Sequence, residues 1–164
     1  MRKEILISLV LGFLLDCLLG DPHSIPHPVV AIGKLISGLE KLLRRIFPKT
    51  KSGEIAAGAV LWVLTVAVCF LVPLAILCAC GRVAPWLRVA GSSLMCWQIL
   101  AAKSLKTESM KVYTALKTGT IEDARYAVSM IVGRDTKALD APAVARAAVE
   151  TVAENCSDGV IAPM

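Results

Sequence analysis

The longest uncharged stretch of the chain, from Ala56 to Cys80, limits what the chain can fold into more than any other feature. It reads AAGAVLWVLTVAVCFLVPLAILCAC and carries no charged side chain. About 20 consecutive apolar residues form a helix long enough to span a bilayer, so this stretch predicts a membrane helix with a kink at Pro73. Hydrophobic residues make up 56% of the chain and charged residues 19%. This balance is more apolar than in typical soluble domains, which supports the same prediction.

Two further apolar segments are predicted to enter the membrane. Ile5–Leu19 contains a single charge, Asp16, and Pro85–Ala102 contains a single charge, Arg88, near its start. An arginine near a helix end can extend its charged group to the membrane surface. Strand-like alternation is absent. We therefore expect an all-α polytopic membrane protein, with a first membrane segment in residues 1–20 and two membrane helices in residues 56–102.

The basic residues predict the orientation of these spans. Six of them lie in residues 21–55 and eight in residues 103–164, so these segments hold fourteen of the eighteen lysines and arginines. Basic loops remain on the cytoplasmic side. We expect a multi-pass protein of the cell inner (plasma) membrane, with both segments in the cytosol. Aromatic residues are few and the basic residues flank apolar runs, so the lipid bilayer is the predicted partner and nucleic acid is not.

The two cytosolic segments are expected to be helical. In Val30–Ile46 apolar residues recur at helical spacing with basic residues opposite, which predicts an amphipathic helix on the membrane surface. The last segment predicts three helices. Leu105–Leu116 forms the first, Thr120 caps a second that ends at Gly133, and Asp140 caps the third.

The last of these helices carries a charged stripe on an alanine-rich background. Arg146, Glu150, Glu154 and Asp158 recur every four residues, and Asn155 lies beside them. One interpretation is a solvated face with an Arg146–Glu150 ion pair. The other is an oxygen-ligand site that holds Mg²⁺ together with a phosphate group. The segment VGRDTKALD, residues 132–140, leaves a similar choice: Arg134 and Asp135 form a local pair, or Arg134 binds phosphate or carboxylate oxygens.

The segment GDPHSIPHPV, residues 20–29, holds the two histidines of the chain, His23 and His27. Three prolines exclude a helical pair of histidines, and no further soft ligands are spaced for zinc. A neutral histidine could instead accept a proton or donate a hydrogen bond to a substrate. The remaining possibility is that these histidines only occupy a turn at a helix end.

Three segments in this order resemble the CobD/CbiB family, the adenosylcobinamide-phosphate synthases of cobalamin biosynthesis. They read LLDCLLGDPHSIPHPVVAIGKLISGLEKLLR, IEDARYAVSMIVGRDT and VARAAVETVAENCSDGVIAP. Members of this family are considerably longer and have further membrane helices after the last segment. The chain is therefore expected to correspond to the N-terminal half of such an enzyme.

The resemblance implies an ATP-dependent amide ligation that joins adenosylcobyric acid to (R)-1-aminopropan-2-ol or its O-phosphate. It implies ATP and Mg²⁺ as cofactors, a corrinoid and aminopropanol (phosphate) as substrates, and the missing C-terminal half as a partner. Roles are assigned to the matching positions. We expect His27 or Asp21 to take a proton, Arg134, Asp135, Thr136 and His23 to bind substrate or phosphate, and Glu150, Glu154, Asn155 and Asp158 to hold Mg²⁺.

The alternative function is a non-catalytic, corrinoid-binding membrane scaffold or a transporter subunit. A transporter places ionisable groups deep within its spans. The predicted spans contain only Asp16 and Arg88, both near span ends, which argues against transport. No Walker-type phosphate-binding loop is present, so ATP must bind in another way.

Overall fold

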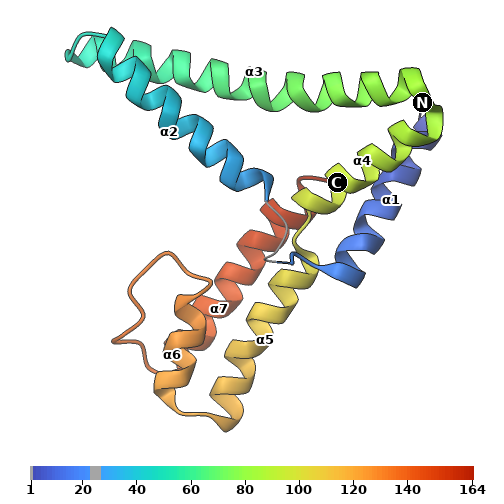
Figure 1. Ribbon diagram of the computed structural model, residues 1–164. Helices are drawn as coiled ribbons and strands as arrows, with labels where there is room; N and C mark the ends of the chain where they lie inside the picture. Colours follow the sequence, from blue (N-terminus) through green and yellow to red (C-terminus); the bar gives the residue numbers. More distant parts are fainter. Residues whose placement is uncertain (1, 23–26) are drawn as a thin grey trace. The chain divides into compact units, whose positions relative to one another are not determined.

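A computed structural model describes residues 2–22 and 27–164 (Figure 1). These residues form helices and no strands, which confirms the all-α prediction. The chain divides into two compact units, Met1–Pro22 with Ser93–Met164 and His23–Ser92. The elements are α1 (Arg2–Leu19), α2 (Pro28–Ile46), α3 (Lys51–Val83), α4 (Pro85–Ile99), α5 (Ala102–Thr118), α6 (Ile121–Ser129), α7 (Ala141–Cys156) and a short π-helical segment, η1 (Ser157–Ile161).

Helix α3 contains the predicted Ala56–Cys80 span and extends beyond it at both ends. Its 33 residues make it the one helix, within residues 2–22 and 27–164, that is long and apolar enough to cross a membrane. None of its apolar window is buried inside the protein, and Trp62 and Phe70 are among its exposed side chains. Pro73 lies within the helix and does not end it. The length and composition of α3 thus suggest association with a membrane.

The other two predicted spans are helical but differ from α3. Helix α1 has 18 residues and begins with three charged ones, Arg2, Lys3 and Glu4. Helix α4 has 15 residues and ends at Ile99, three residues before the predicted end of that span. At 1.5 Å per residue α4 rises about 22 Å, less than the roughly 30 Å hydrocarbon core. The crossing of a membrane by α1 and α4 therefore stays a prediction.

Helices α2 and α3 form a hairpin within the second unit. The predicted amphipathic helix Val30–Ile46 is confirmed and begins two residues earlier, at Pro28. Leu43 is buried where α2 meets α3, and the Thr50 side chain accepts a hydrogen bond from the Gly53 N–H at 3.2 Å. A Cβ atom at Gly53 would lie 2.2 Å from the Pro48 carbonyl oxygen, so only glycine allows this close turn.

Helices α5, α6 and α7 pack side by side as a bundle in the first unit (Figure 1). Small and β-branched residues form its core, which lets the three helices approach closely: Val112, Ala124, Val128, Val144, Ala147 and Ala148. The predicted caps are confirmed. Thr120 and Asp123 form a capping box at the start of α6, and Asp140 accepts a hydrogen bond from the Ala143 N–H at 2.9 Å.

One predicted helix boundary in the bundle is wrong. Helix α6 ends at Ser129 and not at Gly133, and Gly133 does not adopt a left-handed conformation. The N–H groups of Ile131 and Val132 both bond to the Val128 carbonyl, which closes the helix in a tight turn. Both side chains then pack against the core. Burial of these two apolar residues takes the chain out of the helix and places the following loop over α7.

A buried aspartate joins α1 to the start of α5. Asp16 is fully buried, and its Oδ2 accepts hydrogen bonds from the N–H groups of Ala102 at 2.8 Å and Lys103 at 3.3 Å. These are two of the N–H groups that a helix start leaves without an internal partner. Gly20 has a φ of 66°, and its carbonyl accepts a hydrogen bond from Trp97 Nε1 at 2.9 Å. The C-terminal end of α1 and Gly20 are thereby fixed beside α4 and the N-terminus of α5.

Candidate functional site

A pocket of about 390 Å³ lies between α7 and the loop that follows α6. It is the place where side chains from two separate sequence motifs meet. Four predicted site residues line it: Arg134, Glu150, Glu154 and Asn155. The other lining residues are Ile131, Val132, Gly133 and Thr151.

The arginine of this pocket contacts the first of its acids. Arg134 Nη2 lies 2.9 Å from Glu150 Oε2, and each side chain is more than half exposed. The ion pair therefore runs from the loop to α7, and the Arg146–Glu150 pair considered from the sequence is not among the ion pairs of residues 2–22 and 27–164. An exposed pair contributes little stability. The guanidinium has further N–H donors, so Arg134 can also bind an anion.

The acidic side of the pocket offers oxygen atoms from one face of α7. Glu150 and Glu154 are one turn apart, and Asn155 Nδ2 donates to the Thr151 carbonyl at 2.9 Å, which orients the amide. Mg²⁺ is commonly held by one or two carboxylates together with substrate phosphates and water. The carboxylate and amide oxygens of these residues are ligands of the type that Mg²⁺ prefers. The described part of the chain contains no group of three or more His, Cys, Asp or Glu side chains able to hold a metal by themselves.

The structure does not bring Asp158 into this pocket. The α-helix ends at Cys156, and the next turn is π-helical, with the Ala162 N–H bonded to the Ser157 carbonyl at 2.8 Å. The hydrogen bonds of a π-helical turn run to the fifth residue, so the chain after Cys156 leaves the regular α-helical register that the sequence prediction assumed. The stripe seen in the sequence therefore stays regular only as far as Glu154.

The two residues after Arg134 make local contacts. Asp135 Oδ1 accepts a hydrogen bond from the Lys137 N–H at 3.0 Å, and the buried Thr136 donates its hydroxyl to the Arg125 carbonyl at 3.0 Å. Arg125 Nε in turn donates to the Leu139 carbonyl at 2.7 Å. Arg125 was not singled out from the sequence, and nothing in its spacing indicates this role. These bonds fix the loop that presents Arg134.

On the outer side of the same loop lies a second hollow of about 410 Å³. Arg134 lines both cavities, together here with Arg125 and Lys137. The remaining lining residues are Glu122, Tyr126, Ser129, Asp135 and Thr136. Arg125 of α6 and two basic residues of the loop thus line one hollow, at the position that the sequence marked as phosphate-binding.

The histidine motif divides between the two units. Asp21 is exposed and directly follows Gly20 in the first unit, whereas His27 belongs to the second. His27 caps α2: its Nδ1 accepts a hydrogen bond from the Val29 N–H at 3.2 Å. A neutral histidine that accepts at Nδ1 carries its proton on Nε2. His23 lies outside the described residues, so its predicted contact with substrate stays a prediction.

Comparison with known proteins places these motifs in one family. The family model described as CobD/Cbib protein matches residues 9–164. The chain is 43% identical over 159 residues to the cobalamin biosynthesis protein CobD of Clostridium perfringens. This match covers 97% of this chain and 50% of that protein. It is 49% identical over 151 residues to CobD of Geobacter metallireducens, and this match covers 92% of this chain and 46% of that protein.

A third relative gives the same picture. CobD of Listeria monocytogenes serotype 4b is 45% identical over 160 residues, which covers 98% of this chain and 50% of the relative. The chain therefore spans about half the length of the curated relatives it matches. No solved structure matches the chain significantly.

Proposed function

Because the chain belongs to the CobD/CbiB family, we propose that it serves cobalamin biosynthesis as the N-terminal half of an ATP-dependent amide ligase. The reaction joins adenosylcobyric acid to (R)-1-aminopropan-2-ol or its O-phosphate and gives adenosylcobinamide (phosphate). One observation carries the proposal: Arg134 and the acids of α7, which come from separate segments of the chain, line one pocket. The C-terminal half of the enzyme is the proposed partner.

The charges of this pocket favour a phosphate that arrives with a divalent cation. Arg134 contributes one positive charge, and Glu150 and Glu154 contribute two negative charges. A bare phosphate would be repelled by the carboxylates. We assign Glu150, Glu154 and Asn155 to Mg²⁺, with Asp158 as a more distant candidate, and Arg134 to the phosphate oxygens. When bound, Mg²⁺ would neutralise charge on the transferred phosphoryl group.

The reaction needs an activated acyl group, because a free carboxylate is a poor acyl donor. The propionate oxygen attacks the terminal phosphorus of ATP, the bridging P–O bond breaks and ADP leaves. The amine nitrogen then attacks the acyl carbon, a C–N bond forms, and inorganic phosphate leaves with the oxygen. In this scheme Arg134 holds the phosphoryl oxygens in both steps. Asp135 and Thr136 act by fixing the loop that presents it.

The amine must lose a proton before or during its attack, and Asp21 and His27 are the proposed acceptors. The capping bond at His27 Nδ1 bears on this choice, because a neutral imidazole would then present an N–H donor at Nε2. Asp21 is an exposed carboxylate, and an ionised carboxylate offers only acceptor atoms. We therefore favour Asp21 as proton acceptor and His27 as a hydrogen-bond donor to substrate.

Two substitutions at His27 separate a role in the reaction from a role that is limited to capping α2. Asparagine also caps helices well, whereas alanine does not. If His27 donates a hydrogen bond to the substrate, His27→Asn and His27→Ala should both lower turnover, by roughly 10–100-fold for the loss of one hydrogen bond to a charged group. If His27 only caps α2, His27→Asn should keep activity near that of the unsubstituted protein and His27→Ala should lower protein abundance.

We also propose that α1 and α4 enter the membrane with α3, so that the protein is multi-pass in the cell inner membrane. The support is the placement of basic residues in 21–55 and 103–164. Single cysteines at Ser52 and Ser157, in a background without the six native cysteines, report on this topology. Both should resist a membrane-impermeant thiol reagent in intact cells and react after lysis. Labelling of either site in intact cells would contradict it.

The direct test is an assay of membranes that contain the protein in its longest natural form. With ATP, Mg²⁺, adenosylcobyric acid and the amino alcohol, the amide product should form in step with ADP release. Product formation should stop when ATP or Mg²⁺ is withheld. Corrinoid binding without ADP release or product would instead support the scaffold function.

A further inference from the structure

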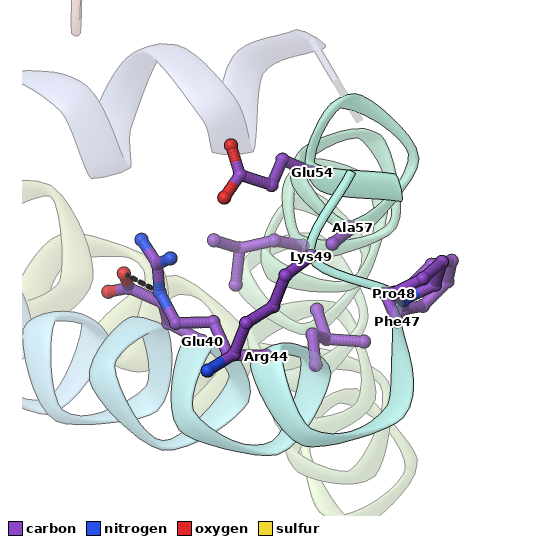
Figure 2. A pocket seen from close by; sticks show the side chains of 10 residues that line it. Glu40, Arg44, Phe47, Pro48, Lys49, Glu54 and Ala57 are labelled. Atoms are coloured by element: carbon purple, nitrogen blue, oxygen red, sulfur yellow. Dashed lines mark hydrogen bonds and ion pairs between the residues drawn. The ribbon is translucent and has the colours of Figure 1, made fainter. Parts of the chain in front are cut away.

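The hairpin of the second unit contains a pocket to which the proposed reaction assigns no role. It has a volume of about 560 Å³ and lies between the end of α2 and the first turns of α3 (Figure 2). Its lining comes from both helices and their short link: Glu40, Leu43, Arg44, Phe47, Pro48, Lys49, Glu54, Ala57, Gly58 and Leu61.

Charged groups gather on one side of this pocket. Figure 2 shows the charged ends of Arg44, Lys49 and Glu54 on one side, away from Phe47 and Pro48. Arg44 Nε bonds to Glu40 Oε1 at 2.8 Å. Within the described part of the chain, the side chains of Lys49 and Glu54 make no hydrogen bond or ion pair. One cation and one carboxylate thus remain available at the pocket rim.

The pocket also lies at a defined place along α3. Glu54 precedes the uncharged run that begins at Ala56, and Ala57 and Leu61 belong to that run. If α3 crosses a membrane, as the proposed function holds, the pocket lies where acyl chains meet headgroups. An amphipathic helix such as α2 lies in the same layer. The ligand that meets this pocket is then an amphiphile with a polar end.

The charges of the rim indicate the kind of headgroup. Two cations, Arg44 and Lys49, face two carboxylates, Glu40 and Glu54, so the rim has no net charge. A neutral rim of paired signs complements a zwitterion better than an anionic lipid. A carboxylate accepts hydrogen bonds from a primary ammonium, whereas a quaternary ammonium offers none and is usually bound by several aromatic rings. This pocket has a single aromatic residue, Phe47.

We propose that this pocket binds a phospholipid whose headgroup ends in a primary ammonium, phosphatidylethanolamine. Lys49 contacts its phosphate, Glu54 contacts its ammonium, and an acyl chain follows the apolar surface of α3 from Leu61 onward. The proposal rests on the membrane crossing of α3 and not on the ligase reaction. Its function would be to fix the cytosolic end of the hairpin at the headgroup layer.

Native mass spectrometry of the purified protein with an equimolar mixture of phosphatidylethanolamine, phosphatidylcholine and phosphatidylglycerol tests this. The ethanolamine lipid should be the most abundant in the bound fraction. Glu54→Gln and Lys49→Gln should each lower its binding by roughly three- to ten-fold, as expected for the loss of one charged hydrogen-bond partner near a surface. Lys41→Gln removes the same charge from α2 outside the pocket and should leave binding unchanged.

Equal binding of the three lipids would overturn the proposal, as would an equal loss in Lys41→Gln and Lys49→Gln, which would mean a general surface charge effect. Preference for phosphatidylglycerol would also overturn it. Carbonate extraction of membranes serves as a separate readout for α3. Protein released by carbonate would contradict the membrane crossing itself, whereas retained protein without lipid preference would contradict the pocket alone.

Discussion

Valines in the α5–α7 bundle and in helix α3 have opposite surroundings. Val128 and Val144 in the bundle are completely buried, whereas Val63 and Val66 in α3 are 54% and 49% exposed. The bundle helices have one apolar face each and cover it with one another. Helix α3 is apolar on all sides, and its apolar window is not buried within the protein.

The comparison teaches that the two regions draw on different sources of stability. The bundle buries its apolar face in its own core and adds helix caps at Thr120 and Asp140. Helices α2 and α3 bury only Leu43 and Gly53, and the apolar window of α3 stays uncovered within the protein. This difference is the basis for proposing that the bundle carries the chemistry and that the hairpin anchors the protein.

The strongest way to break this comparison is to place the same charge in each region. Val144→Asp buries a carboxylate in the core and should lower the free energy of bundle unfolding by more than about 4 kcal/mol. Hydrogen exchange measured by mass spectrometry on the full chain should then show loss of protection throughout α5–α7. Val66→Asp should leave that protection intact and instead lower membrane insertion, at a cost of about 3 kcal/mol in the apolar layer. Equal effects of both changes on the bundle would contradict the comparison.

A smaller effect is expected where α1 is joined to the bundle. Asp16→Ala removes the acceptor for two N–H groups at the start of α5 and should cost about 1–3 kcal/mol. Exchange of the first-turn amides of α5 should accelerate accordingly. Asp16→Asn is the matched control, because its amide oxygen can still accept these bonds. If Asp16→Ala leaves these amides fully protected, Asp16 does not hold α5.

The smallest effect is expected at the exposed cap of α6. Thr120→Ala removes the capping side chain and should cost the helix about 1 kcal/mol. The Thr120 backbone N–H and then its hydroxyl donate to Asp123, and these bonds lower the pKa of the Asp123 carboxyl below its usual range. The stabilisation that comes from the ionised Asp123 carboxylate is therefore fully present above the ordinary pKa of an aspartate. It is lost as the pH falls through the lower pKa of Asp123 in the folded protein. An NMR titration should show the pKa of Asp123 rising in Thr120→Ala as the hydroxyl bond is lost, and an unchanged value would contradict a contribution of that bond.

Local patterns predicted much of this fold. The uncharged run from Ala56 predicted α3, the helical spacing of apolar residues predicted α2, and Thr120 and Asp140 marked the starts of α6 and α7. Such signals act within a few residues, so they can be seen in a sequence. The end of α6 was missed, because it depends on the burial of Ile131 and Val132 against helices that come later in the chain.

Contacts between distant residues account for most of what the sequence did not reveal. Nothing near Asp16 in the sequence indicates that it caps a helix starting at Ala102. The residues around Arg134 likewise do not indicate that it forms an ion pair with Glu150. The stripe of α7 predicted Glu150 and Glu154 on one face, and both line the pocket. It also predicted Asp158 at this site, but Asp158 lies in the π-helical segment that follows α7 and does not line the pocket.

The central claim is that the α7 face of the bundle carries the chemistry, and one comparison of turnover tests it most directly. Glu154→Gln removes a carboxylate from the pocket, and Glu108→Gln removes one from an ion pair on α5 outside it. Both are measured in the ATP- and Mg²⁺-dependent amide assay, at equal protein abundance in the membrane. We predict at least a roughly ten-fold loss of turnover in Glu154→Gln, as for impaired metal sites, and none in Glu108→Gln. Near-normal turnover in both would contradict the claim and leave the acids of α7 as a solvated surface.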